Sequence, residues 1–165
     1  METRPKLEIK LTVLDKMLEL VSLFALCLIW WLAIYYFFVL PNIIPVHFSA
    51  SGKPDSYGSK ETIFILPIIG LFIFILLSLL NKYPQIFNYP VKITAANALK
   101  QYTNGTRMIR YVKTAVLVIF TLILLFTGLT ATGKSNGLGV WFLPLTLVLI
   151  VIPVVYLISK AFKIG

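Results

Sequence analysis

Three side chains that could do chemistry together lie in one polar stretch of the sequence. His47 is the one histidine of the chain, Asp55 follows eight residues later, and Lys60 lies five residues beyond that. A carboxylate that accepts a hydrogen bond from an imidazole can hold the ring in place as a general base. We therefore expect Asp55 to orient His47 and Lys60 to pair with Asp55, which makes these three the candidate catalytic residues.

A hydrolytic site would also need a nucleophile, and the same stretch contains several serines. Ser49, Ser51 and Ser59 are the candidates, although none of them lies in a Gly-x-Ser-x-Gly turn. A membrane-embedded hydrolase that uses His47 and Asp55 is therefore one hypothesis for the protein.

The acids and the histidine do not form a metal-ligand pattern. Zinc takes at least three good protein ligands, and His47, Asp55 and Glu61 could supply them only by an unusual fold-back of the chain. Cys27, the single cysteine, lies in an apolar run. We expect neither a metal nor a cofactor.

Two other interpretations of the polar stretch involve no reaction. Its residues could recognise a ligand, because binding sites commonly lie on loops above a rigid scaffold, or they could pin the loop onto the helix ends. We expect a non-enzymatic binding or sensing protein. The candidate ligand-binding residues are Pro45, His47, Phe48, Gly52, Asp55, Tyr57 and Lys60.

The composition excludes most soluble proteins. Of the 165 residues, 59% are hydrophobic and 13% are charged, whereas a soluble domain has roughly 25% charged residues. The mean hydropathy is +0.91. This excludes a soluble globular enzyme, a disordered tail and a disulfide-rich secreted domain, and it indicates an integral membrane protein of one domain.

Four apolar runs are long enough to cross a bilayer as helices. They cover residues 20–40, 63–80, 114–131 and 138–158. Each spans about 27–32 Å at 1.5 Å per residue, close to the thickness of a hydrocarbon core. We expect an all-α membrane protein with a structured loop at 41–62 and a basic loop at 81–113. Pro153 in the last run removes the helical hydrogen bond to the carbonyl of Leu149.

The basic residues predict the orientation of these helices. Of the 15 lysines and arginines, only Lys53, Lys60 and Lys134 fall in the first and third loops, which leaves 12 on the other side of the membrane. The positive-inside rule then places both termini and the second loop in the cytoplasm, and loop 41–62 outside. We expect a multi-pass protein of the bacterial cytoplasmic membrane, whose outer loop meets a peptide, a lipid or an envelope partner.

The second loop is basic and contains no acid. It could serve only to set the topology, or it could bind an anionic lipid or an acidic cytoplasmic partner. The residues of such a patch would be Lys100, Arg107, Arg110 and Lys113. Because the topology accounts for the positive charge, we expect no binding of nucleic acid. We also expect a helix from Thr106 into the third span, with Gly105 near its start.

Glu19 is the one candidate carboxylate for proton-coupled transport in the first span. It lies at the edge of the first span, within reach of Lys16 or the lipid headgroups, and no charge lies deep in any span. A proton-coupled transporter ordinarily carries an ionisable group at depth. A small transporter that works through Glu19 is a further hypothesis, and it would have to form a homo-oligomer because four helices enclose little volume.

The outer loop carries a motif that resembles a known family. Ile-Pro-x-His-Phe is followed by Gly-x-Pro-Asp-x-Tyr-Gly-x-Lys, and Pro45, His47, Gly52, Asp55 and Lys60 match it. The pattern resembles an uncharacterised bacterial membrane-domain family that also occurs at the N-terminal end of Sdp-type toxin immunity proteins. The resemblance implies a four-span fold and an immunity role against a secreted peptide toxin. It also implies that a transcriptional repressor can be held at the membrane.

Overall fold

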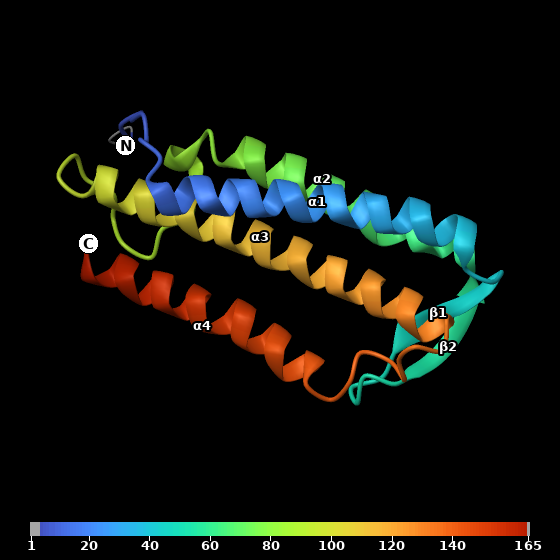
Figure 1. Cartoon of the computed structure of the whole chain (residues 1–165). Coiled ribbons are helices and arrows are strands. Elements are labelled where there is room, and N and C mark those ends of the chain that lie inside the picture. Colours follow the sequence, from blue (N-terminus) through green and yellow to red (C-terminus); the bar gives the residue numbers. More distant parts are fainter. Residues whose placement is uncertain (1–3, 165) are drawn as a thin grey trace.

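The computed structural model describes residues 4–164. Four long helices follow one another as α1 (Val13–Val39), α2 (Ile65–Leu80), α3 (Ala98–Ala131) and α4 (Phe142–Lys163). An antiparallel hairpin, β1 (Ile43–Phe48) and β2 (Pro54–Ser59), leads from α1 through the 3-10 helix η1 (Lys60–Phe64) into α2. A second 3-10 helix, η2 (Pro84–Ile86), lies between α2 and α3. Figure 1 shows the two chain termini at one end of the bundle and the hairpin at the other. We call these the terminal end and the hairpin end.

Four helical segments of the described residues are long and apolar enough to cross a membrane: α1, η1 together with α2, α3, and α4. The mostly helical fold with four candidate spans confirms the main sequence prediction. The segment predicted as a structured loop contains a β-hairpin, so the fold is not purely helical. α3 has 34 residues and is therefore about 51 Å long, which exceeds the thickness of one hydrocarbon core.

α1 begins seven residues before the predicted span because a capping box starts it. The side chain of Thr12 accepts a hydrogen bond from the backbone N–H of Asp15, and the Asp15 carboxylate accepts one from the backbone N–H of Thr12 at 2.9 Å. The two bonds satisfy donors that the first helical turn leaves without partners. Hydropathy finds only the apolar part of such a helix.

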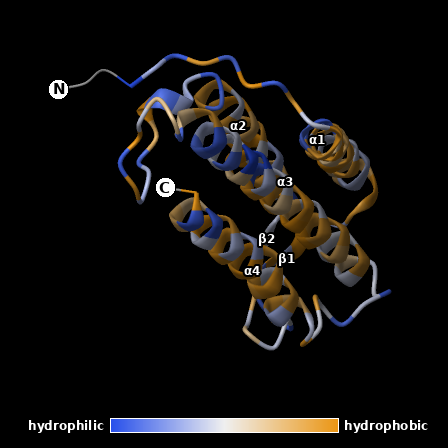
Figure 2. Ribbon diagram, turned by 90° about the vertical axis from the view of Figure 1, so that its left-hand side faces the viewer, coloured by the Kyte–Doolittle hydropathy of each residue, from blue (hydrophilic) through white to orange (hydrophobic). Residues whose placement is uncertain are grey.

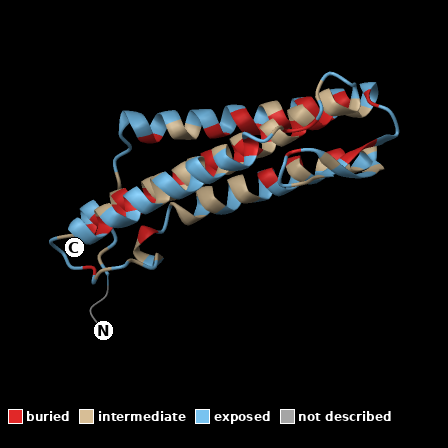
Figure 3. Ribbon diagram, turned by 90° about the horizontal axis from the view of Figure 1, so that it is seen from below, coloured by how far each residue is buried: buried red, intermediate tan, exposed pale blue. Residues whose placement is uncertain are grey.

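α3 is the central helix of the bundle and packs against α1, α2 and α4. Figure 3 shows the buried residues on the faces where the helices meet. The largest core cluster joins α1, β1, η1 and α3, and its most buried members are Ile29, Ala33, Ile44 and Leu117. α2 and α4 have few buried residues. Figure 2 shows hydrophilic residues on the parts of α3 and α4 nearest the termini.

Two glycines let aromatic side chains approach α3 closely. A Cβ atom at Gly128 would overlap the ring of Tyr36 on α1, and one at Gly105 would lie 3.1 Å from the ring of Tyr89. The prediction that Gly105 lies near a helix start is wrong, because α3 begins at Ala98 and runs through this position. The packing of Tyr89 on the bare backbone accounts for a glycine inside the helix, about two turns from its first residue.

Side chains of α3 hold α4 through its main-chain carbonyls. The hydroxyl of Tyr111 donates to the carbonyl of Leu149 at 2.8 Å. Pro153 has no N–H to donate to this carbonyl, so Tyr111 supplies the missing donor. Two amides make similar bonds, Gln101 Nε2 to the Ala161 carbonyl and Asn104 Nδ2 to the Leu157 carbonyl.

Candidate functional site

The hairpin brings His47 and Asp55 together. His47 lies near the end of β1 and Asp55 near the start of β2, and the strand register is irregular on both sides of His47. The Nδ1 atom of His47 lies 2.6 Å from the Oδ1 atom of Asp55, with side-chain exposures of 69% and 44%. The structure therefore contains the pairing that the sequence predicted. Asp55 fixes the imidazole ring through Nδ1, and the Nε2 atom of His47 remains available to a ligand.

Lys60 does not join this pair. No ion pair between Lys60 and Asp55 occurs within residues 4–164; the Lys60 ammonium lies 5.2 Å from the ring centroid of Phe37. The expectation that Lys60 pairs with Asp55 is therefore wrong. Lys60 is the first residue of η1, where the chain leaves the strand and turns back toward α1.

The serines of the hairpin are bonded among themselves. The hydroxyl oxygens of Ser49 and Ser51 lie 2.9 Å apart, and the Ser49 hydroxyl also donates to the carbonyl of Lys53. The Ser59 carbonyl accepts a bond from Thr62. In the part of the chain that the structure describes, no serine is hydrogen-bonded to His47, so a reaction at His47 would use water rather than a serine nucleophile.

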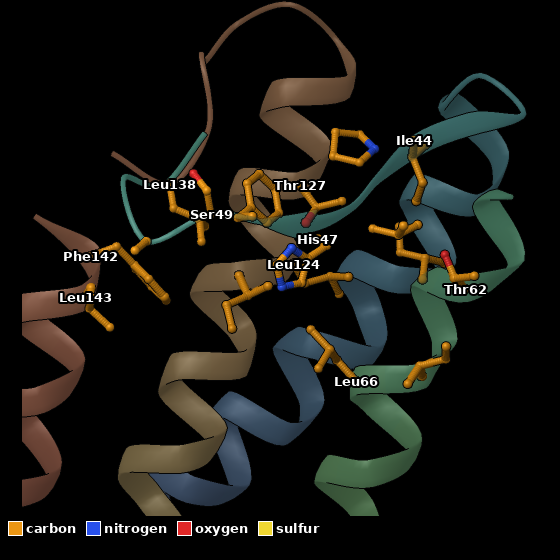
Figure 4. A pocket seen from close by; sticks show the side chains of 18 residues that line it. Ile44, His47, Ser49, Thr62, Leu66, Leu124, Thr127, Leu138, Phe142 and Leu143 are labelled. Atoms are coloured by element: carbon orange, nitrogen blue, oxygen red, sulfur yellow. The ribbon is translucent and has the colours of Figure 1, made fainter. Parts of the chain in front are cut away.

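A cavity of about 520 Å³ lies directly beneath β1. Figure 4 shows the side chains that surround it, which come from β1, from η1 and the start of α2, and from α3 and α4. Most of the wall is apolar, as at Ile63, Leu66, Leu124 and Phe142, and its polar side chains are those of His47, Ser49, Thr62 and Thr127. An apolar cavity with a few polar groups at one side is the usual form of a small-ligand site.

The structure divides the predicted ligand-binding residues into two groups. Pro45, His47, Phe48 and Gly52 line the cavity, and Asp55 supports it through His47. Tyr57 is exposed on β2, and neither Tyr57 nor Lys60 is among the lining residues. Sequence reasoning missed the floor of the cavity, formed by α3 and α4, because hydropathy does not predict which faces of distant helices meet.

The hairpin is fastened to the connection between α3 and α4. The carbonyl of Gly52 accepts a hydrogen bond from the backbone N–H of Leu138 at 2.7 Å. Gly52 has a φ of +76°, and a Cβ atom there would overlap the backbone of Gly139. This glycine is therefore required for the close contact that holds the hairpin over the cavity.

The predicted basic patch turns out to hold helices together. The guanidinium of Arg110 lies 3.1 Å from the carboxylate of Glu19, and the ammonium of Lys113 lies 2.6 Å from it. Lys113 is fully buried, and it also contacts the hydroxyl of Ser78 at 2.9 Å and the ring of Phe74. Glu19 thus faces α3 instead of Lys16 or the lipid headgroups, and the chain does carry a buried charge.

Arg107 forms a second such contact. It donates to both carboxylate oxygens of Asp15, at 2.9 Å and 3.1 Å. Asp15 and Glu19 are four residues apart on α1, and the three cations are each three residues apart on α3, so both sets line one face of their helix. This matched spacing is the sequence signal that could have predicted the contact. Of the four predicted patch residues, Lys100 is the exposed one.

Comparisons with known proteins place the chain in a family. A family model described as "Domain of unknown function (DUF1648)" matches residues 23–71, which cover most of α1, the hairpin, η1 and the start of α2. An uncharacterized protein of Archaeoglobus fulgidus is 30% identical over 127 residues, which cover 72% of this chain and 69% of that protein. No solved structure matches the chain. The chain therefore carries a domain of the DUF1648 family and belongs to the family that includes this archaeal protein.

Proposed function

We propose that the protein is a multi-pass membrane protein that binds an amphipathic ligand, a peptide or a lipid, in the cavity beneath its hairpin. The observation that carries this proposal is the pairing of His47 with Asp55 at the wall of an apolar cavity. The apolar part of the ligand fills the cavity between β1, α3 and α4. Its polar group bonds to the Nε2 atom of His47, since Nδ1 is occupied by Asp55.

The proposed orientation puts the hairpin on the outer side of a bacterial cytoplasmic membrane. The two termini share one end of the bundle (Figure 1), and 12 of the 15 basic residues lie toward that end, in the N-terminal arm, the start of α1, the loop between α2 and α3, the first half of α3 and the end of α4. By the positive-inside rule this end faces the cytoplasm. The cavity then opens near the outer surface, where a secreted peptide or an envelope lipid can reach it.

An immunity role is the specific form of this function that the resemblance to Sdp-type proteins implies. The ligand would then be a secreted peptide toxin, and binding under the hairpin would keep it from its target. The family model supports the immunity role in one respect only: it matches residues 23–71, the part of the chain that contains the hairpin.

A membrane-embedded hydrolase is the second candidate, and one observation favours it. The 2.6 Å contact between His47 and Asp55 is that of a general base held by a carboxylate. Since the Ser49 hydroxyl is bonded to Ser51 and to the Lys53 carbonyl rather than to His47, the nucleophile would be a water molecule on the Nε2 atom of His47.

The test compares two tryptophan variants on one face of α4. Leu143 lines the cavity and Leu147, one turn further along, does not, and both are largely exposed. Wild type, Leu143→Trp, Leu147→Trp and His47→Ala are purified from membranes in mild detergent, and retained ligands are identified by native mass spectrometry. We expect wild type and Leu147→Trp to retain the same ligand and the other two variants to lose it.

The outcome also separates the two candidates. If His47→Ala and wild type retain the ligand equally, the binding proposal is wrong. If His47→Ala accumulates an intact ligand where wild type holds only its hydrolysed fragments, His47 acts in turnover and the protein is a hydrolase. Equal melting temperatures for all four proteins establish that folding is unchanged.

A further inference from the structure

A second cavity, of about 480 Å³, lies at the terminal end of the bundle. It is a cleft between α3, α4 and the segment 86–90, which begins at the last residue of η2. Its wall is formed by side chains such as Phe87, Met108, Ile109 and Leu157. The cleft is thus lined mainly by apolar atoms and shares no residue with the cavity beneath the hairpin.

One polar side chain in the cleft has an unused hydrogen-bonding atom. Asn104 lines the cleft and is 6% exposed. Its Nδ2 atom donates to the Leu157 carbonyl, whereas its Oδ1 atom has no partner among the described residues. A buried carbonyl oxygen without a donor is costly. An occupant of the cleft with a hydroxyl or N–H group would remove that cost.

The outer wall of the cleft is fixed before any ligand binds. The hydroxyl of Tyr89 donates to the carbonyl of Pro84 at 2.9 Å, and the guanidinium of Arg4 donates to the carbonyl of Phe87. Burial raises the pKa of the Tyr89 phenol, so this hydroxyl keeps its proton. The absence of a side chain at Gly105 lets the rings of Phe87 and Tyr89 pack against α3. The cleft is therefore preformed.

The polarity of the cleft changes along the bundle axis. Ile109 and Met108 lie deepest along α3, and Asn104 lies about one turn nearer the terminal end. Lys100 lies one further turn out on α3, and Lys160 and Lys163 lie in the last turn of α4, near the level of Ala161, which lines the cleft. An acyl chain and a polar, charged headgroup follow each other in the same order in a phospholipid.

The charge around the cleft favours an anion. All residues that line it come from positions 80–161, and the sequence contains no acid after Glu61. Within the described residues, no ion pair engages Lys82, Lys100, Lys160 or Lys163. Each cation close to an anionic lipid contributes about 1 kcal/mol, or roughly a fivefold gain in affinity.

We propose that this cleft is a binding site for one anionic glycerophospholipid. One acyl chain lies against Met108 and Ile109, a hydroxyl of the headgroup, as in the terminal glycerol of phosphatidylglycerol, donates to the Oδ1 atom of Asn104, and the phosphate lies near the lysines at the end of α4. The site is independent of the ligand proposed beneath the hairpin and lies at the opposite end of the molecule.

The test measures lipid retention by the full-length protein in detergent. Phosphatidylglycerol and phosphatidylcholine with identical acyl chains are titrated in, and bound lipid is counted by native mass spectrometry. Ile158→Trp fills the cleft, whereas Val155→Trp changes an exposed residue of α4 that lies outside it. We expect phosphatidylglycerol to bind about tenfold more tightly than phosphatidylcholine, to be lost in Ile158→Trp and to be kept in Val155→Trp.

Two further arms cover the headgroup and the folding of the variants. Lys160→Gln combined with Lys163→Gln leaves the cleft unfilled, and it should weaken phosphatidylglycerol binding by about tenfold, to the level of phosphatidylcholine, whose binding stays the same. Glycerol 3-phosphate, which has no acyl chains, should not compete. Equal binding of the two lipids, full binding by Ile158→Trp, or competition by glycerol 3-phosphate would each overturn the proposal.

Discussion

The hydroxyl of Tyr111 donates a 2.8 Å hydrogen bond to the carbonyl of Leu149, the one acceptor in α4 that Pro153 deprives of its helical donor. Tyr111 on α3 thus compensates for the N–H that Pro153 lacks on α4, and the bond fixes the position of α4 on α3. The wall of the cavity at Phe142 and Leu143 depends on that position, because both residues lie on the same helix.

This relationship predicts a coupling between Tyr111 and Pro153. Tyr111→Phe should lower the free energy of unfolding by about 1 kcal/mol, since the Leu149 carbonyl is left without a donor. In a Pro153→Ala background the helix supplies an N–H, so the same change should cost much less. Reversible unfolding of the four proteins in mixed micelles measures the coupling, and strictly additive effects would contradict this explanation.

The contact between Gly128 and Tyr36 predicts a steric effect. A methyl group at Gly128 would overlap the Tyr36 ring, so Gly128→Ala should destabilise the bundle by about 1–3 kcal/mol. Gly70→Ala is the matched control, because its methyl group would meet a movable side-chain atom of Leu117 at 3.2 Å. Thermal unfolding in detergent should show a clear decrease in the first variant only. Equal melting temperatures would mean that α1 and α3 are less closely packed than described.

The pairing of Glu19 with Lys113 predicts a structural role for both charges. Glu19→Gln leaves the buried Lys113 ammonium without its 2.6 Å partner, which should cost on the order of 3 kcal/mol. Adding Lys113→Met should recover much of the loss, and Glu8→Gln at an exposed acid should change little. If the Glu19→Gln variant melts like wild type, the pair is not structural, and the hypothesis of a transporter that works through Glu19 gains support.

The fastening of the hairpin at Gly52 predicts a local change. Gly52→Ala introduces a methyl group that overlaps the Gly139 backbone, whereas Gly133→Ala imposes the same kind of backbone strain with no atom nearby. Hydrogen exchange should become faster around Leu138 in the Gly52 variant and stay unchanged there in the Gly133 variant. Unchanged hydrogen exchange around Leu138 in both variants would show that the hairpin and the connection between α3 and α4 do not stabilise each other.

Hydropathy and turn residues predicted the parts of the fold that depend on neighbours in sequence. All four apolar runs fall largely within helices, and the spacing of His47 and Asp55 predicted their contact. The parts that depend on distant packing could not be predicted this way. The sequence predicts Lys113 as part of a basic patch because its partner Glu19 lies 94 residues away. It does not predict that α3 continues through Gly105 to Ala98, because a glycine inside the helix is explained only by Tyr89.

The central claim, that the cavity beneath the hairpin holds a specific ligand, is tested most directly by photo-crosslinking in intact membranes. A benzophenone amino acid is placed at Leu143, inside the cavity, or at Leu147, one turn outside it. We predict one adduct of defined mass at position 143 that disappears with His47→Ala and does not form at position 147. The same mixture of bulk lipid adducts at both positions, unaffected by His47→Ala, would contradict the account.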